Sequence, residues 1–181
     1  MLARRLQPQA AMEFDLGLTL LRATVGLVFA AHGAQKAFGW WDGPGPENWT
    51  RSMHSMRFEP AGFWAAVSIL AELLGGIGLA LGLLTPISAA VLAGHSVVII
   101  ARVHWSRGFW NQGSGYEYPL VLLVAAVAFT LAPSAGWSVD AAIGLPILAD
   151  ATIRAALLVI GLAGGLGVSL LTSPAHSQQP G

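Results

Sequence analysis

The sequence contains no cysteine and few charged residues. The absence of cysteine among 181 residues excludes disulfide bonds, thiol chemistry, thiolate-bound iron–sulfur clusters and thioether-linked haem from this chain. Charged residues make up 10% of the chain, whereas a soluble domain carries roughly 25%. The net charge of zero leaves no basic surface for a nucleic-acid partner. Because 55% of the residues are hydrophobic, the chain is predicted to lie in a lipid bilayer.

Five apolar stretches have lengths suited to membrane helices. A spanning helix needs about 20 mostly apolar residues. On this criterion we expect helices over residues 16–38, 62–84, 86–104, 119–132 and 151–172. Thr85 followed by Pro86 predicts a tight hairpin between the second and third of these, since proline is tolerated in the first turn of a helix. The predicted fold class is all-α: a polytopic transmembrane bundle with a four-helix core and a fifth, C-terminal helix.

We divide the chain into a polar segment (1–15), a transmembrane domain (16–144), an additional transmembrane helix (145–173) and a disordered tail (174–181). Two tryptophan-rich connections, 39–61 and 105–117, are expected at the lipid headgroups, where tryptophan rings prefer to lie. Their basic residues favour a cytoplasmic location for these loops. Glycines four residues apart allow helix backbones to approach closely, and we favour packing within the chain over a dimer seam for the pairs Gly78/Gly82 and Gly161/Gly165.

Ionisable residues inside the apolar stretches are the candidates for function, because a charge at membrane depth is costly unless it is paired. A rise of about 1.5 Å per residue places Arg22, His95 and Glu72 roughly 9, 13 and 18 Å from the N-terminal side. Arg22 is long enough to reach Glu72, so we expect these three residues to form a midplane cluster. A second cluster is expected at the opposite face, with His32 joining the two; its members are Lys36, Arg102, His104 and Glu117.

Each of these residues also has a structural interpretation. The arginine and the glutamate could form an ion pair that only fixes helix register. The lysine and Arg102 could reach for the membrane interface. His32 or His95 could be a hydrogen-bonded packing residue, and their depths differ by about 10 Å, which argues against a bis-histidine haem. His104 and Glu117 offer too few ligands to predict a metal site.

Four sequence runs together resemble the DoxX family. They are LLRATVGLVFAAHGAQKAFG (20–39), AELLGGIGLALGLLTP (71–86), GFWNQGSGYEYPLVLL (108–123) and WSVDAAIG (137–144), in the family's order and spacing. The resemblance covers residues 16–144 and implies a small bacterial or archaeal membrane protein, usually of four helices. Positions that recur in the family correspond here to Arg22, Gly33, Lys36, Glu72, Gly75, Gly76, Gly82, Glu117 and Asp140. This chain has Pro86 where the family commonly has arginine, and the helix from residue 151 lies beyond the family pattern.

The resemblance implies a place in redox chemistry. Family members are linked to thiosulfate:quinone oxidoreductase small subunits and to membrane-anchored complexes that pair with sulfurtransferase and superoxide dismutase. The first hypothesis is therefore a cell-membrane subunit of an oxidoreductase complex with quinone as its ligand and no covalently bound cofactor. Glu72 and His32 would relay protons, Arg22 would tune the glutamate, and Lys36 with Glu117 would dock a partner or bind a substrate anion.

Two other functions remain open. The second hypothesis, of equal weight, is a non-enzymatic membrane anchor for soluble oxidoreductase or sulfurtransferase partners. The third is a small transporter or proton pathway, which the absence of internal repeats disfavours. An anchor predicts that Glu72→Gln lowers protein abundance, whereas a redox subunit predicts normal abundance and lost quinone-dependent turnover. A homo-oligomer is compatible with each hypothesis.

Overall fold

The computed structural model describes residues 2–132 and 136–172, and its long elements are helices. They are α1 (Leu2–Phe38), α3 (Ala61–Leu81), α4 (Thr85–Ile99), α5 (Glu117–Leu131) and α7 (Ala151–Leu171). Within the described residues, four segments are long and apolar enough to cross a membrane: Gln9–Phe38, Ala61–Leu81, Thr85–Arg107 and Ala151–Leu171. The shorter apolar helix Glu117–Leu131 is the predicted fourth helix of the core. These helices confirm the predicted all-α membrane bundle, while the tail over 174–181 lies outside the described residues.

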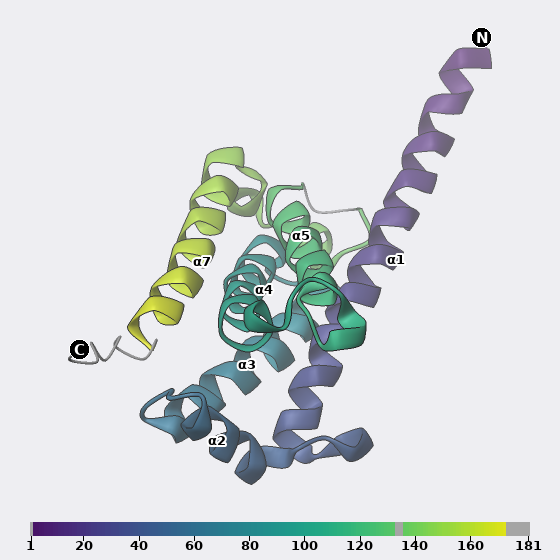
Figure 1. Ribbon diagram of the computed structural model, residues 1–181. Coiled ribbons are helices and arrows are strands. Elements are labelled where there is room, and N and C mark those ends of the chain that lie inside the picture. The colour runs from purple at the N-terminus through teal and green to yellow at the C-terminus, as the bar shows by residue number, and fades with distance from the viewer. Residues whose placement is uncertain (1, 133–135, 173–181) are drawn as a thin grey trace.

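Several elements differ from the expected boundaries. Helix α1 begins at Leu2, because residues 9–13 (Gln-Ala-Ala-Met-Glu) are strong helix formers that continue the helix into the polar segment. Its first turns extend beyond the other helices (Figure 1). Helix α4 continues through a π turn, Ile100–His104, into a 3-10 turn, Trp105–Arg107. The first tryptophan-rich connection contains a short helix α2 (Gly45–Ser55), and a further short helix, α6 (Val139–Ile143), precedes α7.

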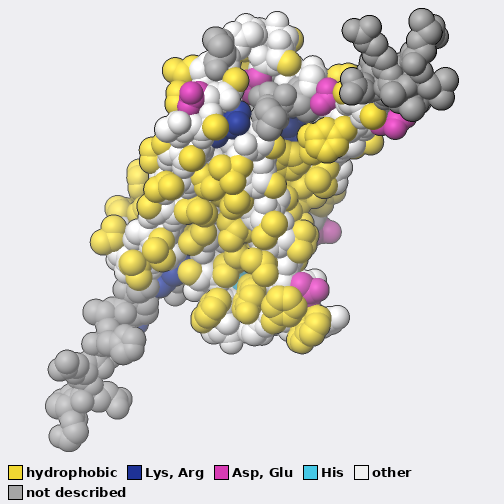
Figure 2. Space-filling view, turned by 90° about the horizontal axis from the view of Figure 1, so that it is seen from above, with side chains coloured by type: hydrophobic (Ala, Val, Ile, Leu, Met, Phe, Trp, Pro, Cys, Tyr) yellow, Lys and Arg dark blue, Asp and Glu magenta, His cyan; other side chains and the backbone are white. Residues whose placement is uncertain are grey.

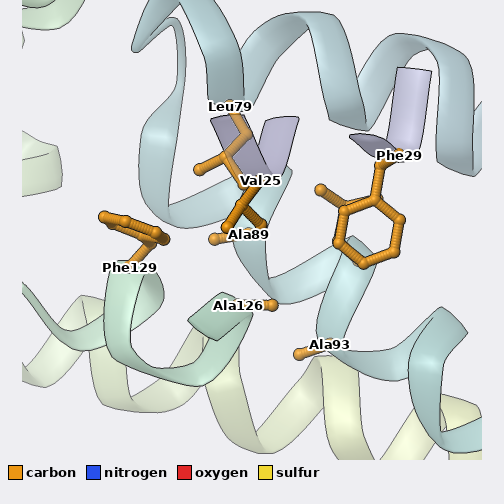
Figure 3. Packing of buried hydrophobic residues seen from close by; sticks show 8 residues of the cluster. Val25, Phe29, Leu79, Ala89, Ala93, Ala126 and Phe129 are labelled. Atoms are coloured by element: carbon orange, nitrogen blue, oxygen red, sulfur yellow. The ribbon is translucent and has the colours of Figure 1, made fainter. Parts of the chain in front are cut away.

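Helix α4 lies at the centre of the bundle. It contacts α3, α5 and α7, while α1 packs along α3 and also touches α5 (Figure 1). The buried core lies where α1, α3, α4 and α5 meet, and its side chains point toward one another (Figure 3). Those labelled in the figure are Val25, Phe29, Leu79, Ala89, Ala93, Ala126 and Phe129. The core therefore joins the four helices that the sequence predicted as one unit.

Helix α7 packs against α4 of this four-helix unit through glycine residues. A Cβ atom on Gly161 would overlap the carbonyl oxygen of Ala90, and one on Gly165 would overlap that of Gly94. The backbones of α4 and α7 therefore touch directly, which is how small residues stabilise helix pairs in lipid. This contact confirms that the Gly161/Gly165 pair packs within the chain. The N-terminus of α7 is capped by Asp150, whose side chain accepts hydrogen bonds from the backbone of Thr152 and Ile153.

We expect Gly165→Ala to destabilise the protein. The added methyl group has no room against α4, and overpacking of this kind costs roughly 1–3 kcal/mol. The matched control is Gly164→Ala, because a Cβ at Gly164 meets no atom within 4 Å, and alanine is the better helix former. Thermal unfolding of both variants in one detergent measures the difference. Equal stability of the two would show that α7 does not pack against α4 in this way.

The outer surface fits a bilayer. Figure 2 shows hydrophobic side chains across the middle of one face, with charged side chains mainly toward its two ends. Large apolar side chains are exposed on several helices, among them Leu20, Leu27, Leu74, Val159 and Leu170. In water such a surface would be exceptional, but in lipid it is the expected exterior. The protein is thus a multi-pass membrane protein built of helices.

Candidate functional site

A buried carboxylate holds two basic side chains near the middle of the bundle. Oε1 of Glu72 lies 2.6 Å from Nζ of Lys36 and 2.9 Å from Nε2 of His95. The glutamate side chain is 2% exposed, and each of its partners is 12% exposed. Lys36 is also 3.5 Å from Oγ of Ser68. We call Lys36, Ser68, Glu72 and His95 the buried polar cluster.

The helices bring this cluster together by their register. Ser68 and Glu72 are four residues apart on α3 and therefore share one face. His95 comes from the antiparallel neighbour α4. Lys36 lies near the end of α1, and helical side chains point back toward the helix N-terminus, so its ammonium group is directed into the bundle. The ring of Trp49, on α2, covers this ammonium at 4.2 Å.

Arg22 does not join Glu72, and the predicted pairing is wrong. On α1, Gly33 is the residue that lies against Leu73, so Glu72 is level with a point about 16 Å further along α1 than Arg22. The arginine side chain also points toward the N-terminus of α1, away from the cluster. Its Nη2 donates a hydrogen bond to the carbonyl oxygen of Trp137 at 2.8 Å. Lys36, which we had placed in the opposite cluster, is the cation that pairs with the glutamate.

The arginine belongs to a structural junction at the other end of the bundle. There the carboxylate of Asp140 accepts hydrogen bonds from the backbone nitrogens of Leu84 and Thr85, at 2.7 and 2.8 Å, and from the Thr85 hydroxyl at 2.7 Å. These bonds satisfy backbone N–H groups at the start of α4 that have no partner within the helix. A Cβ on Gly82 would overlap the guanidinium of Arg22, so glycine is needed at this contact. We assign this junction to stabilising the turn between α3 and α4.

The remaining candidates lie apart from one another. His32 is exposed and meets the ring of Tyr118 edge-on, at 6.3 Å between centroids. His104 hydrogen bonds through Nδ1 to the carbonyl of Ser114, and Glu117 accepts from the backbone of Asn111, so both shape the second tryptophan-rich loop.

Arg102, in the π turn, connects two segments that are distant in the sequence. It donates to the carbonyls of Met56 and Thr172, at 2.7 and 2.8 Å. Its guanidinium also lies over the ring of Phe58, at 5.1 Å from the centroid. The residues of the expected second cluster therefore lie in three places. His104 and Glu117 are in the second tryptophan-rich loop, Arg102 joins Met56 and Thr172, and Lys36 belongs to the buried polar cluster.

A cavity of about 280 Å³ borders the buried polar cluster. Its wall includes the polar or charged residues Lys36, Ser68, His95 and Arg102. The rest of its wall is largely apolar and comes from α2, α3, α4 and α7, from the α2–α3 connection and from the π turn after α4: Trp49, Met53, Met56, Phe58, Trp64, Val67, Ala71, Val91, Val98, Ile99, Val103, Ile160 and Val168, with glycines of α4 and α7. An apolar cavity with a few convergent polar groups is the usual form of a small-molecule site.

Three atoms at or beside this cavity decide what it could bind. The indole Nε1 of Trp49 is buried and has no hydrogen-bond partner within the described part of the chain. The ammonium of Lys36 is a second donor on the wall. Oε2 of Glu72, behind the wall, likewise lacks a partner among residues 2–132 and 136–172. Two residues of the wall, Trp49 and Lys36, thus carry hydrogen-bond donors, and the Glu72 carboxylate lies behind the wall.

The cavity opens toward the lipid-facing surface. Val67, Val91 and Ile160 line it and are each more than a third exposed on the outside of α3, α4 and α7. An apolar molecule dissolved in the bilayer could therefore enter between these helices.

Sequence reasoning missed several residues of this site. Ser68 stands one helical turn before Glu72, and that spacing would have indicated it. Trp49 gave no signal beyond its place in a tryptophan-rich loop. Gly164 belongs to α7, the helix outside the family pattern, and nothing in the sequence connected it with Glu72.

Together, the fold and the site define a polytopic helical membrane protein with a lipid-accessible apolar cavity beside a buried Lys–Glu–His cluster. Residues 17–105 match the family model described as DoxX, so this part of the chain is a DoxX domain, which supports membership of the DoxX family. The match includes Arg22, Lys36, Glu72 and His95, while α5 and α7 lie after it. No curated protein and no solved structure matches the chain.

Proposed function

We propose that this protein is the membrane subunit of a quinone-linked oxidoreductase complex, and that the cavity binds the quinone head group. The observation that carries the proposal is the combination of an apolar, lipid-accessible cavity with donor-bearing residues in its wall and a buried cluster of ionisable side chains beside them. A quinone ring is flat and apolar, and its two carbonyl oxygens only accept hydrogen bonds. The unpartnered indole N–H of Trp49 and the ammonium of Lys36 supply such bonds.

The residues have distinct parts in this proposal. Lys36 binds one quinone carbonyl and polarises it, while Glu72 holds the lysine in place through the 2.6 Å ion pair. Reduction of a quinone to a quinol adds two electrons to the ring and one proton to each oxygen. His95 lines the cavity and contacts Glu72, so in this proposal its imidazole passes the protons to the ring, and the ionised glutamate holds the imidazole in place.

The electrons come from a soluble redox protein, because a chain without cysteine has no thiolate to hold a cluster or to form a redox disulfide. We place the docking of that partner, an oxidoreductase or a sulfurtransferase, at the tryptophan-rich loops on the cavity side of the bundle. Trp40, Trp41, Trp105 and Trp110 are each more than half exposed there. The same exposed aromatic residues favour the second candidate function, a membrane anchor that only recruits such a partner.

Binding of a quinone to the protein in lipid nanodiscs tests the proposal, with Trp49→Phe as the variant. Phenylalanine keeps an aromatic ring beside Lys36 but is smaller and lacks the N–H, so affinity should fall by at least roughly tenfold, the equivalent of one net hydrogen bond. Trp110→Phe, at an exposed position outside the cavity, should bind like the wild type. An anchor predicts no saturable binding in any of the three proteins.

A further inference from the structure

A second apolar groove begins where the cavity ends. It has a volume of about 520 Å³ and shares Val67, Ala71 and Val91 with the cavity. From there it follows α3 and α4 to the turn between them, where Leu83 forms part of its wall. Between Val67 and Gly78 the groove extends about 16 Å along the helix axis. Cavity and groove are therefore continuous over much of the thickness of the bilayer.

The groove has the form of a trough. Its floor on α3 consists of small residues at helical spacing, Ala71, Gly75 and Gly78. One side is a ridge on α3 that includes Leu70 and Leu74, and the other is a ridge on α4 that includes Ile87 and Val91. No charged side chain lines it among the residues described. Such a trough fits a flexible hydrocarbon chain that lies parallel to the helices.

We propose that this groove is the binding site for the isoprenoid chain of the quinone whose head group occupies the cavity. This inference rests on the proposed function and names its ligand class: a long-chain polyprenyl quinone. A head group in the cavity lies next to the residues that the cavity shares with the groove. The chain attached to the ring therefore extends from the cavity directly into the groove. The chain then runs along the bilayer normal, as lipid chains do, and gains close packing against the groove walls.

The test compares two quinones with the same dimethoxybenzoquinone ring, one carrying a polyprenyl chain and one carrying only a methyl group. Binding is measured in nanodiscs as quinone retained above empty nanodiscs, at equal quinone per lipid, so that partitioning into lipid cancels. The variant Leu70→Ser/Leu74→Ser removes one ridge of the groove. The control, Leu166→Ser/Leu170→Ser, makes the same change at the same spacing on α7. These two leucines are similarly exposed and line neither the cavity nor the groove.

We expect the groove variant to bind the polyprenyl quinone roughly tenfold more weakly than the wild type, and the methyl quinone equally well. The control should match the wild type with both ligands. If the wild type binds both quinones and the groove variant binds the polyprenyl quinone as tightly as the wild type does, the groove inference is overturned while the proposed function stands. If the wild type binds neither quinone, the proposed function itself fails.

Discussion

Gly164→Phe is expected to abolish quinone binding without disturbing the fold. Gly164 lines the cavity from α7, and a Cβ atom added there would meet no atom within 4 Å, so a side chain at this position has room to begin beside the cavity. In a cavity of about 280 Å³ a phenyl ring takes the place of the ligand. We expect at least a roughly hundredfold loss of affinity, or about 2.7 kcal/mol, in the nanodisc binding assay.

The matched control is Gly167→Phe. A Cβ at Gly167 also meets nothing within 4 Å, and this residue does not line the cavity. The two variants add the same ring to the same helix, so they share any effect on membrane insertion or helix propensity. Equal quinone affinity in both variants, with intact folding, would place the ligand elsewhere and leave the cavity without a role.

Glu72→Ala should strongly destabilise the protein. It leaves the Lys36 ammonium in a buried position without its counter-charge, and breaking a buried ion pair in this way costs about 3–5 kcal/mol. Thermal unfolding in detergent, together with the yield of monodisperse protein, measures the loss. Glu59→Ala is the control, because the Glu59 carboxylate pairs with His54 on the exposed surface, where such pairs contribute little.

The same account predicts a rescue. Adding Lys36→Met to Glu72→Ala removes the orphaned charge, and replacing both members of a buried pair by apolar groups of similar volume is often neutral for stability. The double variant should therefore regain the part of the lost stability that is due to the charge, while the smaller volume of alanine keeps its cost. The wild type, Glu72→Ala, Lys36→Met and the double variant form a double-mutant cycle for the pair. A double variant as unstable as Glu72→Ala would show that the glutamate is needed for more than holding the lysine.

Features that depend on residues close together in the sequence could be predicted from it, whereas contacts between distant segments could not. The helices follow from composition within single stretches, and even the short α5 was placed to within two residues of its observed start at Glu117. Charges inside apolar helices marked Glu72, Lys36 and His95 as candidates, and the structure brings these three side chains together. The close helix packing at Gly161 and Gly165 was likewise indicated by a local pattern, the spacing of four residues.

The pairing of these residues could not be derived in the same way. It depends on the vertical offset between α1 and α3, which glycine contacts such as Gly33 against Leu73 determine and which no single helix reveals. A shift of a few residues exchanged Arg22 for Lys36 as the partner of Glu72. The cavity depends on residues still further apart in the sequence, because its walls come from α2, α3, α4 and α7 together.

The most direct measurement is the quinone content of the purified protein, determined by mass spectrometry of organic extracts and compared with the quinone-to-lipid ratio of the source membrane. The wild type and the folded Lys36→Met/Glu72→Ala variant are purified side by side, so that a loss of structure cannot imitate a loss of binding. We predict quinone well above the membrane ratio in the wild type and quinone at the membrane ratio in the variant. Equal enrichment in both proteins, or none in a well-folded wild type, would contradict a quinone site at the buried polar cluster.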